Sequence, residues 1–264
     1  MNMQQIQTFC SSPWGKTTQY FDCVDSTNTL AKELARAGAP EGTVLLADRQ
    51  ASGRGRLGRS FLSPGGMGIY LSVILRPRVS ARELMHLTCA AAVAVCHAID
   101  RVTGVRPGIK WINDLVCRQR KIGGILTELS FVPGSDMVDY AVIGIGINCH
   151  QKEEDFPPEL RSIAGALEMS RAHPFTRSAL AAAIIDQLHT LSGCLLTEKD
   201  AILDAYRQNC ITLGKPVQIL RPDGSEEGIA LDVDADGGLI VQTSTGIRTV
   251  SAGEVSVRGL YGYV

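Results

Sequence analysis

Apolar residues recur along the chain at two spacings, one typical of helices and one typical of strands. Helical spacing predicts a first helix that begins after candidate N-cap residues at 25–28 and ends at Gly38. The same spacing predicts two further helices, over 178–196 and 199–211. A capping box formed by Ser80 and Glu83 predicts a further helix that ends near Thr103. Short apolar runs bounded by turn residues predict strands over 43–47, 69–75, 109–116, 123–131 and 138–148. This order of elements predicts an α+β fold with a mixed sheet.

The pattern changes near residue 213. Short apolar runs follow at 217–220, 228–233, 239–243 and 247–250. The pairs between them are typical of hairpin turns, namely Asp223-Gly224, Asp236-Gly237 and Thr245-Gly246. Closely spaced short strands predict a small antiparallel barrel. We therefore predict two domains, residues 16–212 and residues 213–264.

Charge and composition narrow the function classes. The 264 residues include 26 basic and 27 acidic side chains, a balance that argues against a general nucleic-acid binder. The first ten residues lack the apolar stretch of a signal peptide. The apolar helical stretch 84–99 contains His86 and His97 and is too short to cross a bilayer. We expect a cytoplasmic protein without membrane insertion.

The cysteine and histidine spacings give no sign of a metal site. The eight cysteines include no C-x-x-C pair, and the five histidines form no H-E-x-x-H motif. This argues against a zinc ribbon and a thioredoxin-like site. The sequence predicts reduced cysteines and no metal bound by the protein alone.

Two glycine motifs resemble nucleotide-binding sequences but lack the required context. Gly15-Lys16-Thr17 resembles the end of a P-loop, yet Cys10 stands where the first glycine is needed. The run Gly53–Gly58 reads G-x-G-x-x-G, but the glycine- and proline-containing residues after it cannot open a helix. We therefore exclude a P-loop and a Rossmann fingerprint.

A loop at 50–68 concentrates positive charge. Four arginines occur within eleven residues and are interleaved with three glycines: Arg49, Arg54, Arg56 and Arg59. An anionic ligand would relieve their mutual repulsion, and the glycines would let backbone N–H groups approach a phosphate. By itself the pattern fits either a phosphate-binding lid or a solvated turn.

A second polar cluster begins at Lys110-Trp111-Ile112-Asn113-Asp114-Leu115. Asn113 and Asp114 could offer acceptors to a metal-bound nucleotide, and Lys121 supplies a charge at the start of a strand. Gly123-Gly124 would let a ligand lie against the backbone. The alternative is a polar hairpin with Lys121 in water.

Together these motifs resemble those of biotin–protein ligases. The resemblance is carried, in the family's order and spacing, by Ser26-Thr27-Asn28, Gln50, Gly53–Arg59, Lys110–Leu115, Lys121–Leu126, Gly144–Asn148 and Gly253–Arg258. It covers about residues 16 to 260. Phe61 stands where the family usually has Trp, and Ile112 where it usually has Pro. The resemblance implies a class II synthetase-like catalytic domain with a small SH3-like C-terminal barrel.

The resemblance also implies a reaction. Biotin and ATP, with Mg²⁺, would give biotinyl-5′-AMP, and a lysine of a carboxylase's biotin carboxyl carrier domain would take the biotinyl group. A lipoate or octanoate ligase and a non-catalytic biotin or adenylate sensor are the alternatives. Only about 24 residues precede Asp25, so we expect the type without a DNA-binding helix-turn-helix. The sequence leaves open whether the protein forms a homodimer and what the small barrel does.

The resemblance assigns roles residue by residue. Arg56 and Lys121 would be catalytic. Biotin would be bound by Ser26, Thr27, Asn28 and Gln50. The biotin and adenylate phosphate side would be lined by Arg54, Gly55 and Arg56, and Lys121 would contact the biotin carboxylate or acyl phosphate. By the same resemblance, Asn113, Asp114 and Asn148 would lie on the nucleotide and metal side of the site.

Overall fold

The computed structural model describes residues 1–170, 173–221, 224–251 and 256–259. Within them lies a seven-stranded mixed sheet in the order β1-β2-β3-β7-β6-β5-β4, in which only the β1–β2 pair is parallel among the described pairings. Its strands are β1 (Thr18–Val24), β2 (Val44–Gln50), β3 (Gly68–Leu75), β4 (Gly108–Lys110), β5 (Asp114–Cys117), β6 (Arg120–Phe131) and β7 (Val138–Asn148).

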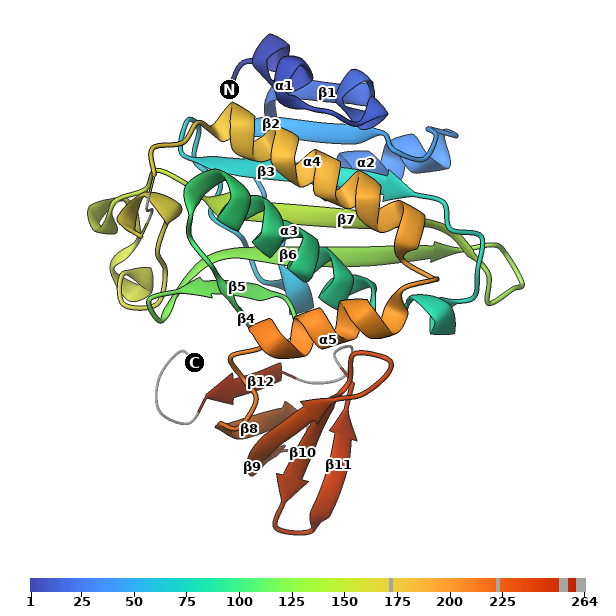
Figure 1. Cartoon of the computed structure of the whole chain (residues 1–264), viewed down its shortest axis with the longest axis vertical. Coiled ribbons are helices and arrows are strands. Elements are labelled where there is room, and N and C mark those ends of the chain that lie inside the picture. Colours follow the sequence, from blue (N-terminus) through green and yellow to red (C-terminus); the bar gives the residue numbers. More distant parts are fainter. Residues whose placement is uncertain (171–172, 222–223, 252–255, 260–264) are drawn as a thin grey trace.

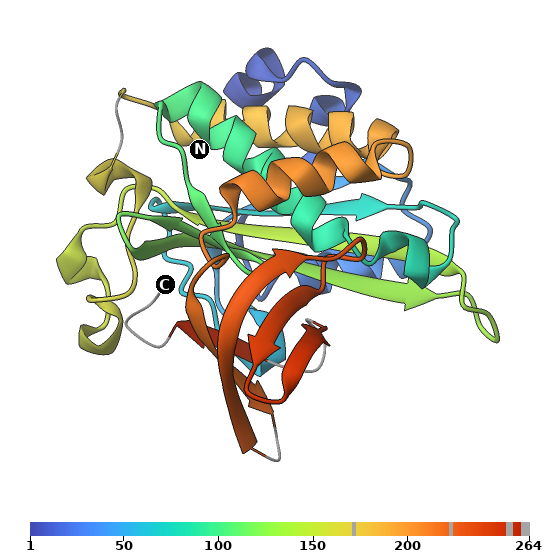
Figure 2. The ribbon, with the colours of Figure 1, turned by 60° about the horizontal axis from the view of Figure 1, so that its bottom comes forward.

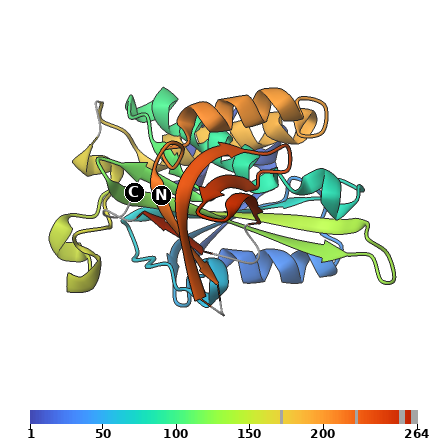
Figure 3. The same cartoon turned by 90° about the horizontal axis from the view of Figure 1, so that it is seen from below.

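Helices cover both faces of this sheet. The α-helices are α1 (Met3–Phe9), α2 (Thr27–Arg36), α3 (Leu87–Thr103), α4 (Arg177–Cys194) and α5 (Lys199–Asn209). Figure 1 shows α3, α4 and α5 in front of the sheet, and Figure 3 shows the blue helix α2 on the opposite face. The short 3₁₀ helices are η1 (Pro13–Thr17), η2 (Arg56–Gly58), η3 (Ala81–Leu84), η4 (Glu153–Asp155), η5 (Pro158–Leu160) and η6 (Leu167–Met169).

The two-sided burial follows from the strand period of two. In β2, Val44 and Leu46 pack into the large core beneath α3 and α4, whereas Leu45 packs with Ala31 and Ala35 of α2. Strands covered on both faces read as continuous apolar runs, which is why the sequence pattern identified β2 and β3.

Helix α3 is the central core helix. The helical segment Ala81–Thr103 is longer than the predicted stretch 84–99, so the prediction from length is wrong: the segment is a membrane-span candidate by length and composition. However, 72% of its most apolar window is buried inside the protein, as in the core helix of a globular domain. The Ser80–Glu83 capping box is present, but it caps η3, and α3 itself begins at Leu87. Gly104 ends the helix in the left-handed conformation that glycine adopts at no steric cost.

A second, five-stranded antiparallel sheet lies below α5, as Figures 1 and 2 show. Its order is β11-β10-β9-β8-β12, and its strands are β8 (Pro216–Arg221), β9 (Gly224–Val233), β10 (Leu239–Thr243), β11 (Gly246–Val250) and β12 (Ser256–Gly259). The predicted turn residue Asp223, the motif residues 253–255 and the last five residues of the predicted second domain, 260–264, lie outside the described residues. The exact domain boundary stays a prediction.

Several elements differ from the sequence prediction, and strand β12 and the short 3₁₀ helices are among those not predicted. The single strand predicted over 109–116 is wrong, because the chain turns at Trp111–Asn113 and forms the antiparallel hairpin β4–β5. Strand β1 was not predicted: it is an edge strand, and its three polar or charged residues, Thr18, Gln19 and Asp22, do not alternate regularly with the apolar ones. Helix α1 was also missed, since its only buried residue is Ile6.

Candidate functional site

A cavity of about 660 Å³ lies where α2, the loop after β2, the β4–β5 hairpin and strands β6 and β7 meet. Its volume is in the range of small-molecule sites. The structure brings every predicted site residue to its lining, namely Ser26, Thr27, Asn28, Gln50, Arg54, Gly55, Arg56, Asn113, Asp114, Lys121 and Asn148. Arg49 is not among the lining residues and lies exposed at the end of β2. The ligand contacts assigned to these residues stay predictions.

Asn28 is fixed at the start of α2 by a buried polar network. Its Nδ2 donates to the Leu126 carbonyl at 3.2 Å and to Glu128 Oε2 at 3.0 Å. The Ser72 hydroxyl lies 2.6 Å from Asn28 Oδ1. A Cβ on Gly144 would come within 1.9 Å of Asn28 Oδ1, so glycine is required where the Asn28 amide crosses β7. The amide is therefore held in one orientation beside the cavity.

Gln50 links the end of β2 to the start of α2. Its Oε1 accepts from the Thr27 amide at 2.9 Å and from the Thr27 hydroxyl at 3.1 Å. Its Nε2 donates to Ser63 Oγ at 2.9 Å. This hydrogen bond connects the second half of the loop at 50–68, called the arginine loop below, to the same network. Ser26, the N-cap residue of α2, is buried, and its side chain makes no capping hydrogen bond.

The arginine loop is folded back on itself next to the cavity. The Gly55 amide donates to the Arg59 carbonyl at 2.7 Å, and the Phe61 amide donates to the Gly53 carbonyl at 2.9 Å. A Cβ on Gly53 would lie 2.3 Å from the Phe61 carbonyl oxygen, so this close crossing requires glycine. Arg54 Nη1 lies 3.5 Å from Glu128 Oε1, which connects the loop to the Asn28 network.

Arg56 reaches the β4–β5 hairpin. Its Nη1 donates to Asn113 Oδ1 at 3.1 Å. Asn113 is itself locked, because its Nδ2 donates to the Ile125 carbonyl and its own carbonyl accepts from the Ile125 amide. Burial lowers the pKa of Arg56, Asp114 opposes this effect, and Arg59 adds to it. The guanidinium remains charged, and an anion beside it would offset both its desolvation and its repulsion from Arg59.

Lys121 and Asp114 face each other across neighbouring strands, with an ion pair between Nζ and Oδ1. Lys121 is partly exposed on β6, and its side chain lies along Gly124, whose Cβ would be 3.4 Å from the lysine Nζ. The absence of a side chain at Gly124 leaves the lysine open to the cavity. No group of three or more His, Cys, Asp or Glu side chains that could hold a metal occurs within the described part of the chain.

Asn148 lies at the cavity but turns its amide toward the protein. Its Nδ2 donates to the Gly165 carbonyl at 2.9 Å, and its Oδ1 accepts from Gln151 Nε2 at 3.3 Å. Both polar atoms have protein partners, so Asn148 supports the wall formed by the segment around Gly165. This makes a direct contact with a nucleotide less favourable for Asn148 than for Asn113.

Some lining or supporting residues were not predicted as site residues. The segment after β7 contributes an apolar wall, Phe156, Leu160, Ile163 and Ala164. Its irregular spacing gives no helix or strand signal. Ser72 and Glu128 lie in predicted strands, but the sequence pattern does not predict their hydrogen bonds to Asn28. Lys110 also lines the cavity and belongs to a motif that the sequence did identify.

Comparison with known proteins agrees with this geometry. Residues 20–148 match the biotin/lipoate A/B protein ligase family, and residues 212–258 match the biotin protein ligase C terminal domain. The bifunctional ligase/repressor BirA of Bacillus subtilis (strain 168) is 34% identical over 244 residues, which span 92% of this chain and 74% of that protein. The chain belongs to the biotin/lipoate A/B protein ligase family.

Further members of this family and its solved structures are similar over nearly the whole chain. The biotin--[acetyl-CoA-carboxylase] ligase of Mycobacterium tuberculosis is 31% identical over 250 residues, covering 91% of this chain and 90% of that protein. The structure of the biotin protein ligase from Aquifex aeolicus in complex with biotin and ATP superposes with a TM-score of 0.77 at 29% identity, covering 92% and 98% of the two chains. The α+β fold with a small antiparallel C-terminal domain is thus confirmed.

The two departures from the usual family motifs occupy defined places. The Phe61 ring lies over Gly146, whose Cβ would be 2.6 Å from the ring, and it meets Tyr70 edge-on at 6.4 Å between centroids. Phe61 therefore keeps an aromatic face at the cavity. Ile112 is buried in the β4–β5 turn, and its carbonyl accepts a hydrogen bond from the Tyr206 hydroxyl at 3.2 Å.

Proposed function

We propose that this ligase activates biotin with ATP as biotinyl-5′-AMP and then transfers the biotinyl group to a lysine of a biotin carboxyl carrier domain. The observation that carries the proposal is that one cavity joins the Asn28 network to the cationic groups of Arg56 and Lys121. An apolar, amide-lined end suits the rings of biotin, and a cationic end suits its carboxylate and the phosphates. The biotin and ATP complex of the Aquifex aeolicus relative supports the same substrates.

The floor of the cavity is built for an extended ligand. Gly124 of β6 and Gly146 of β7 are paired across the sheet, so no side chain rises from this part of the floor. Along β6, the five-residue step from Lys121 to Leu126 corresponds to about 16 Å of strand. Leu126 is the residue whose carbonyl holds Asn28. A ligand can therefore lie along β6 with one end at Asn28 and its carboxylate near Lys121.

In the first step, a carboxylate oxygen of biotin bonds to the α-phosphorus of ATP and pyrophosphate leaves. Two anions must approach each other, so positive charge at the reacting groups lowers the barrier. Arg56 and Lys121 supply that charge from the loop and from β6. Mg²⁺ accompanies ATP and offsets the charge of the leaving pyrophosphate.

The arginine loop would shield the mixed anhydride from water between the two steps. Arg56 closes one side of the cavity through Asn113, and Arg54 ties the loop to Glu128. Such closure protects a reactive intermediate and keeps it bound until the carrier arrives.

In the second step, the lysine amine of the carrier bonds to the acyl carbon, AMP leaves, and the amine loses a proton. No cysteine is needed as a nucleophile. Burial raises the pKa of the Cys149 thiol to about 12, which keeps it protonated and unreactive at neutral pH. All eight cysteines are free, which supports the cytoplasm as the location of this enzyme and its carrier.

The test offers biotin, lipoate or octanoate to the purified enzyme with ATP and Mg²⁺. We expect biotin alone to support ATP–pyrophosphate exchange and an increase in the mass of a carrier domain. Exchange with lipoate or octanoate instead would assign the other ligase activity. Biotin binding without exchange or carrier modification would identify a sensor.

A further inference from the structure

We propose that the β9–β10 turn of the small sheet holds one wall of the ligase cavity in place, through Trp111. In this role Gly237 and Arg207 are positioning residues that act on Asn113 and Arg56 without touching substrate. The inference deepens the proposed function and rests on it for the identity of the ligand.

The first observation is a buried hydrogen bond between the two sheets. Trp111 lines the cavity, is only 4% exposed, and donates from its indole Nε1 to the Gly237 carbonyl at 2.9 Å. An indole N–H has one hydrogen to donate, so a buried tryptophan stays in this position only while its acceptor does. The acceptor here belongs to the small sheet, whereas the indole ring belongs to the cavity wall.

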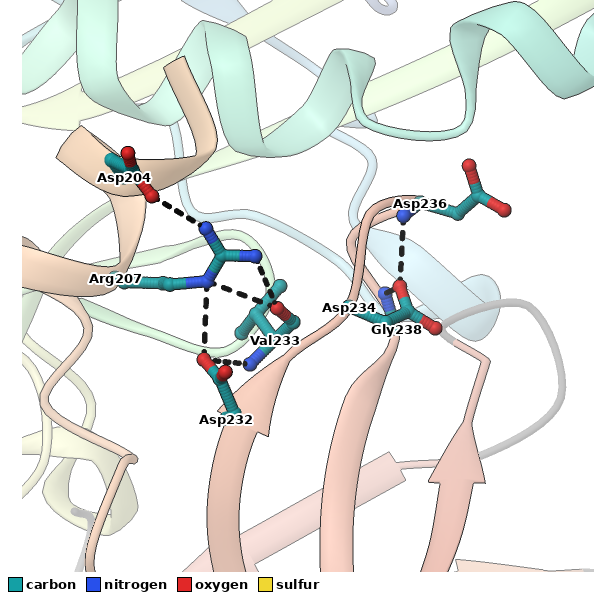
Figure 4. A network of polar contacts seen from close by, with 7 residues as sticks. All are labelled: Asp204, Arg207, Asp232, Val233, Asp234, Asp236 and Gly238. Atoms are coloured by element: carbon teal, nitrogen blue, oxygen red, sulfur yellow. Dashed lines mark hydrogen bonds and ion pairs between the residues drawn. The ribbon is translucent and has the colours of Figure 1, made fainter. Parts of the chain in front are cut away.

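The second observation is that the turn carrying this acceptor is closed by hydrogen bonds to one carboxylate, as Figure 4 shows. Asp234 Oδ1 accepts from the Asp236 amide at 2.9 Å and from the Gly238 amide at 2.7 Å. Gly237 has a φ of +85°, and a Cβ there would lie 3.0 Å from the Cys89 sulfur of α3. The turn therefore fits against the core helix only with glycine at this position.

The third observation is that α5 anchors the turn. Arg207 donates from Nη2 to the Val233 carbonyl at 2.7 Å and from Nε to Asp232 Oδ1 at 3.1 Å, while its Nη1 contacts Asp204 (Figure 4). Lys199 at the other end of α5 pairs with Asp236 at 2.9 Å. Helix α5 thus contacts the turn and the end of β9 through two residues, one near each end of the helix.

The same helix and the linker after it also hold the cavity wall. The Tyr206 hydroxyl donates to the Ile112 carbonyl at 3.2 Å, and Thr212 Oγ1 accepts from the Trp111 amide at 2.9 Å. Two residues beyond Trp111, Asn113 accepts the hydrogen bond from Arg56. A displaced Trp111 would move this acceptor, so the small sheet controls how firmly Arg56 and the arginine loop are held.

The test compares two matched glycine variants of the full-length enzyme. Gly237→Ala introduces a side chain at positive φ in the turn against α3. Gly246→Ala introduces one at φ +125° in the same small sheet, where nothing lies within 4 Å of the new Cβ. Both replacements strain the backbone, but only Gly237→Ala changes the residue whose carbonyl accepts the hydrogen bond from Trp111.

We expect Gly237→Ala to release biotinyl-AMP at least tenfold faster than Gly246→Ala at similar thermal stability. We also expect faster tryptic cleavage after Arg54, Arg56 and Arg59, a readout that needs no substrate. In a Trp14→Phe background, the emission of Trp111 should shift to the red in Gly237→Ala only. Trp14 and Trp111 are the chain's two tryptophans, so this background isolates the reporter.

Equal adenylate release and equal loop cleavage in the two variants would overturn the inference. If Gly237→Ala does not fold, Arg207→Gln replaces it, because this change removes the α5 anchor and leaves the turn backbone unaltered. Exchange by the wild-type enzyme, measured in the same series, tests the proposed function separately. A wild-type enzyme without exchange would refute that function, while the loop cleavage would still decide the positioning role.

Discussion

Arg56 donates from its Nη1 to Asn113 Oδ1 at 3.1 Å, which joins the arginine loop to the β4–β5 hairpin across 57 residues of sequence. Asn113 is in turn bonded twice to Ile125 of β6. Through Asn113, the glycine-rich loop that carries Arg56 is thus connected to the central sheet. The mechanism proposed above depends on this contact.

We expect Arg56→Ala to fold normally and to lose biotinyl-AMP to solvent. A charge-assisted hydrogen bond contributes about 1.5–3 kcal/mol, which corresponds to roughly 10- to 150-fold faster release. Release is measured by rapid filtration of the enzyme–adenylate complex, and carrier biotinylation should fall in parallel. Arg49→Ala is the control, because Arg49 lies exposed at the end of β2 and does not line the cavity. An unchanged rate of carrier biotinylation in Arg56→Ala would refute the lid.

Lys121→Ala should lower biotin-dependent ATP–pyrophosphate exchange by at least about 100-fold, the scale of losing one electrostatic contact to a transition state. The change removes a cation and leaves Asp114 without its Lys121 partner beside the phosphates. Lys121→Ala/Asp114→Asn separates the two effects and should recover part of the rate. Lys16→Met is the control, since Lys16 is exposed and does not line the cavity. Normal exchange in Lys121→Ala would show that this lysine has no part in activation.

The sequence identified the cavity's charged and glycine-rich motifs but not the contacts that orient them. Glycines and arginines at fixed spacing can be read locally, and the residues assigned to the ligand site all line one cavity, whereas Arg49 does not. The acceptors that hold Asn28 and Arg54 cannot be read in this way. Glu128, for example, is one of several polar residues on β6, and its role depends on Asn28 and Lys32 of α2 reaching its carboxylate.

The β4–β5 hairpin shows why an apolar run was not enough to predict a strand. Trp111 and Ile112 continue the apolar pattern of β4, yet the chain turns there. The turn is held by Tyr206 and Thr212, which lie 94 and 101 residues from their partners in the sequence and form hydrogen bonds with the backbone that a strand would have paired. Tertiary contacts overrode the local preference.

The glycines at 144 and 146 should differ in their tolerance of a methyl group. In Gly144→Ala, the new Cβ would meet Asn28 Oδ1 at 1.9 Å, and Asn28 is held by three hydrogen-bonding partners. We expect Gly144→Ala to weaken biotin binding by about 100-fold and to cost about 1–3 kcal/mol of stability. Calorimetric titration with biotin and urea unfolding measure the two effects.

Gly146→Ala would instead meet the ring of Phe61, which is partly exposed and belongs to the loop. The ring can move away, so we expect a loss of biotin affinity below about tenfold and little change in stability. Gly193→Ala on α4 is the control, because nothing lies within 4 Å of its Cβ. Equal effects of the substitutions at 144 and 146 would contradict the fixed position of Asn28.

Glu128 should make the stability of the ligase depend on pH in the acid range. Burial by itself would raise the pKa of Glu128, but hydrogen bonds from Lys32 and Asn28, and the charges of Lys32 and Arg54, outweigh it and lower the pKa. A carboxyl whose pKa is lowered on folding stabilises the folded state above its unfolded pKa of about 4.3. That contribution is lost as the pH falls through the lower pKa of the folded state.

Replacing Glu128 with Gln should remove this pH-dependent contribution while keeping an acceptor for Asn28. We expect the variant to be less stable than the wild type by about 1 kcal/mol at pH 7, where the carboxylate is ionised, with the difference shrinking below about pH 4. Urea unfolding between pH 3 and 7 measures it, with Glu33→Gln on the exposed side of α2 as the control. A difference that stays constant with pH would mean that the Glu128 charge does not stabilise the fold, and that Arg54 is held by other contacts.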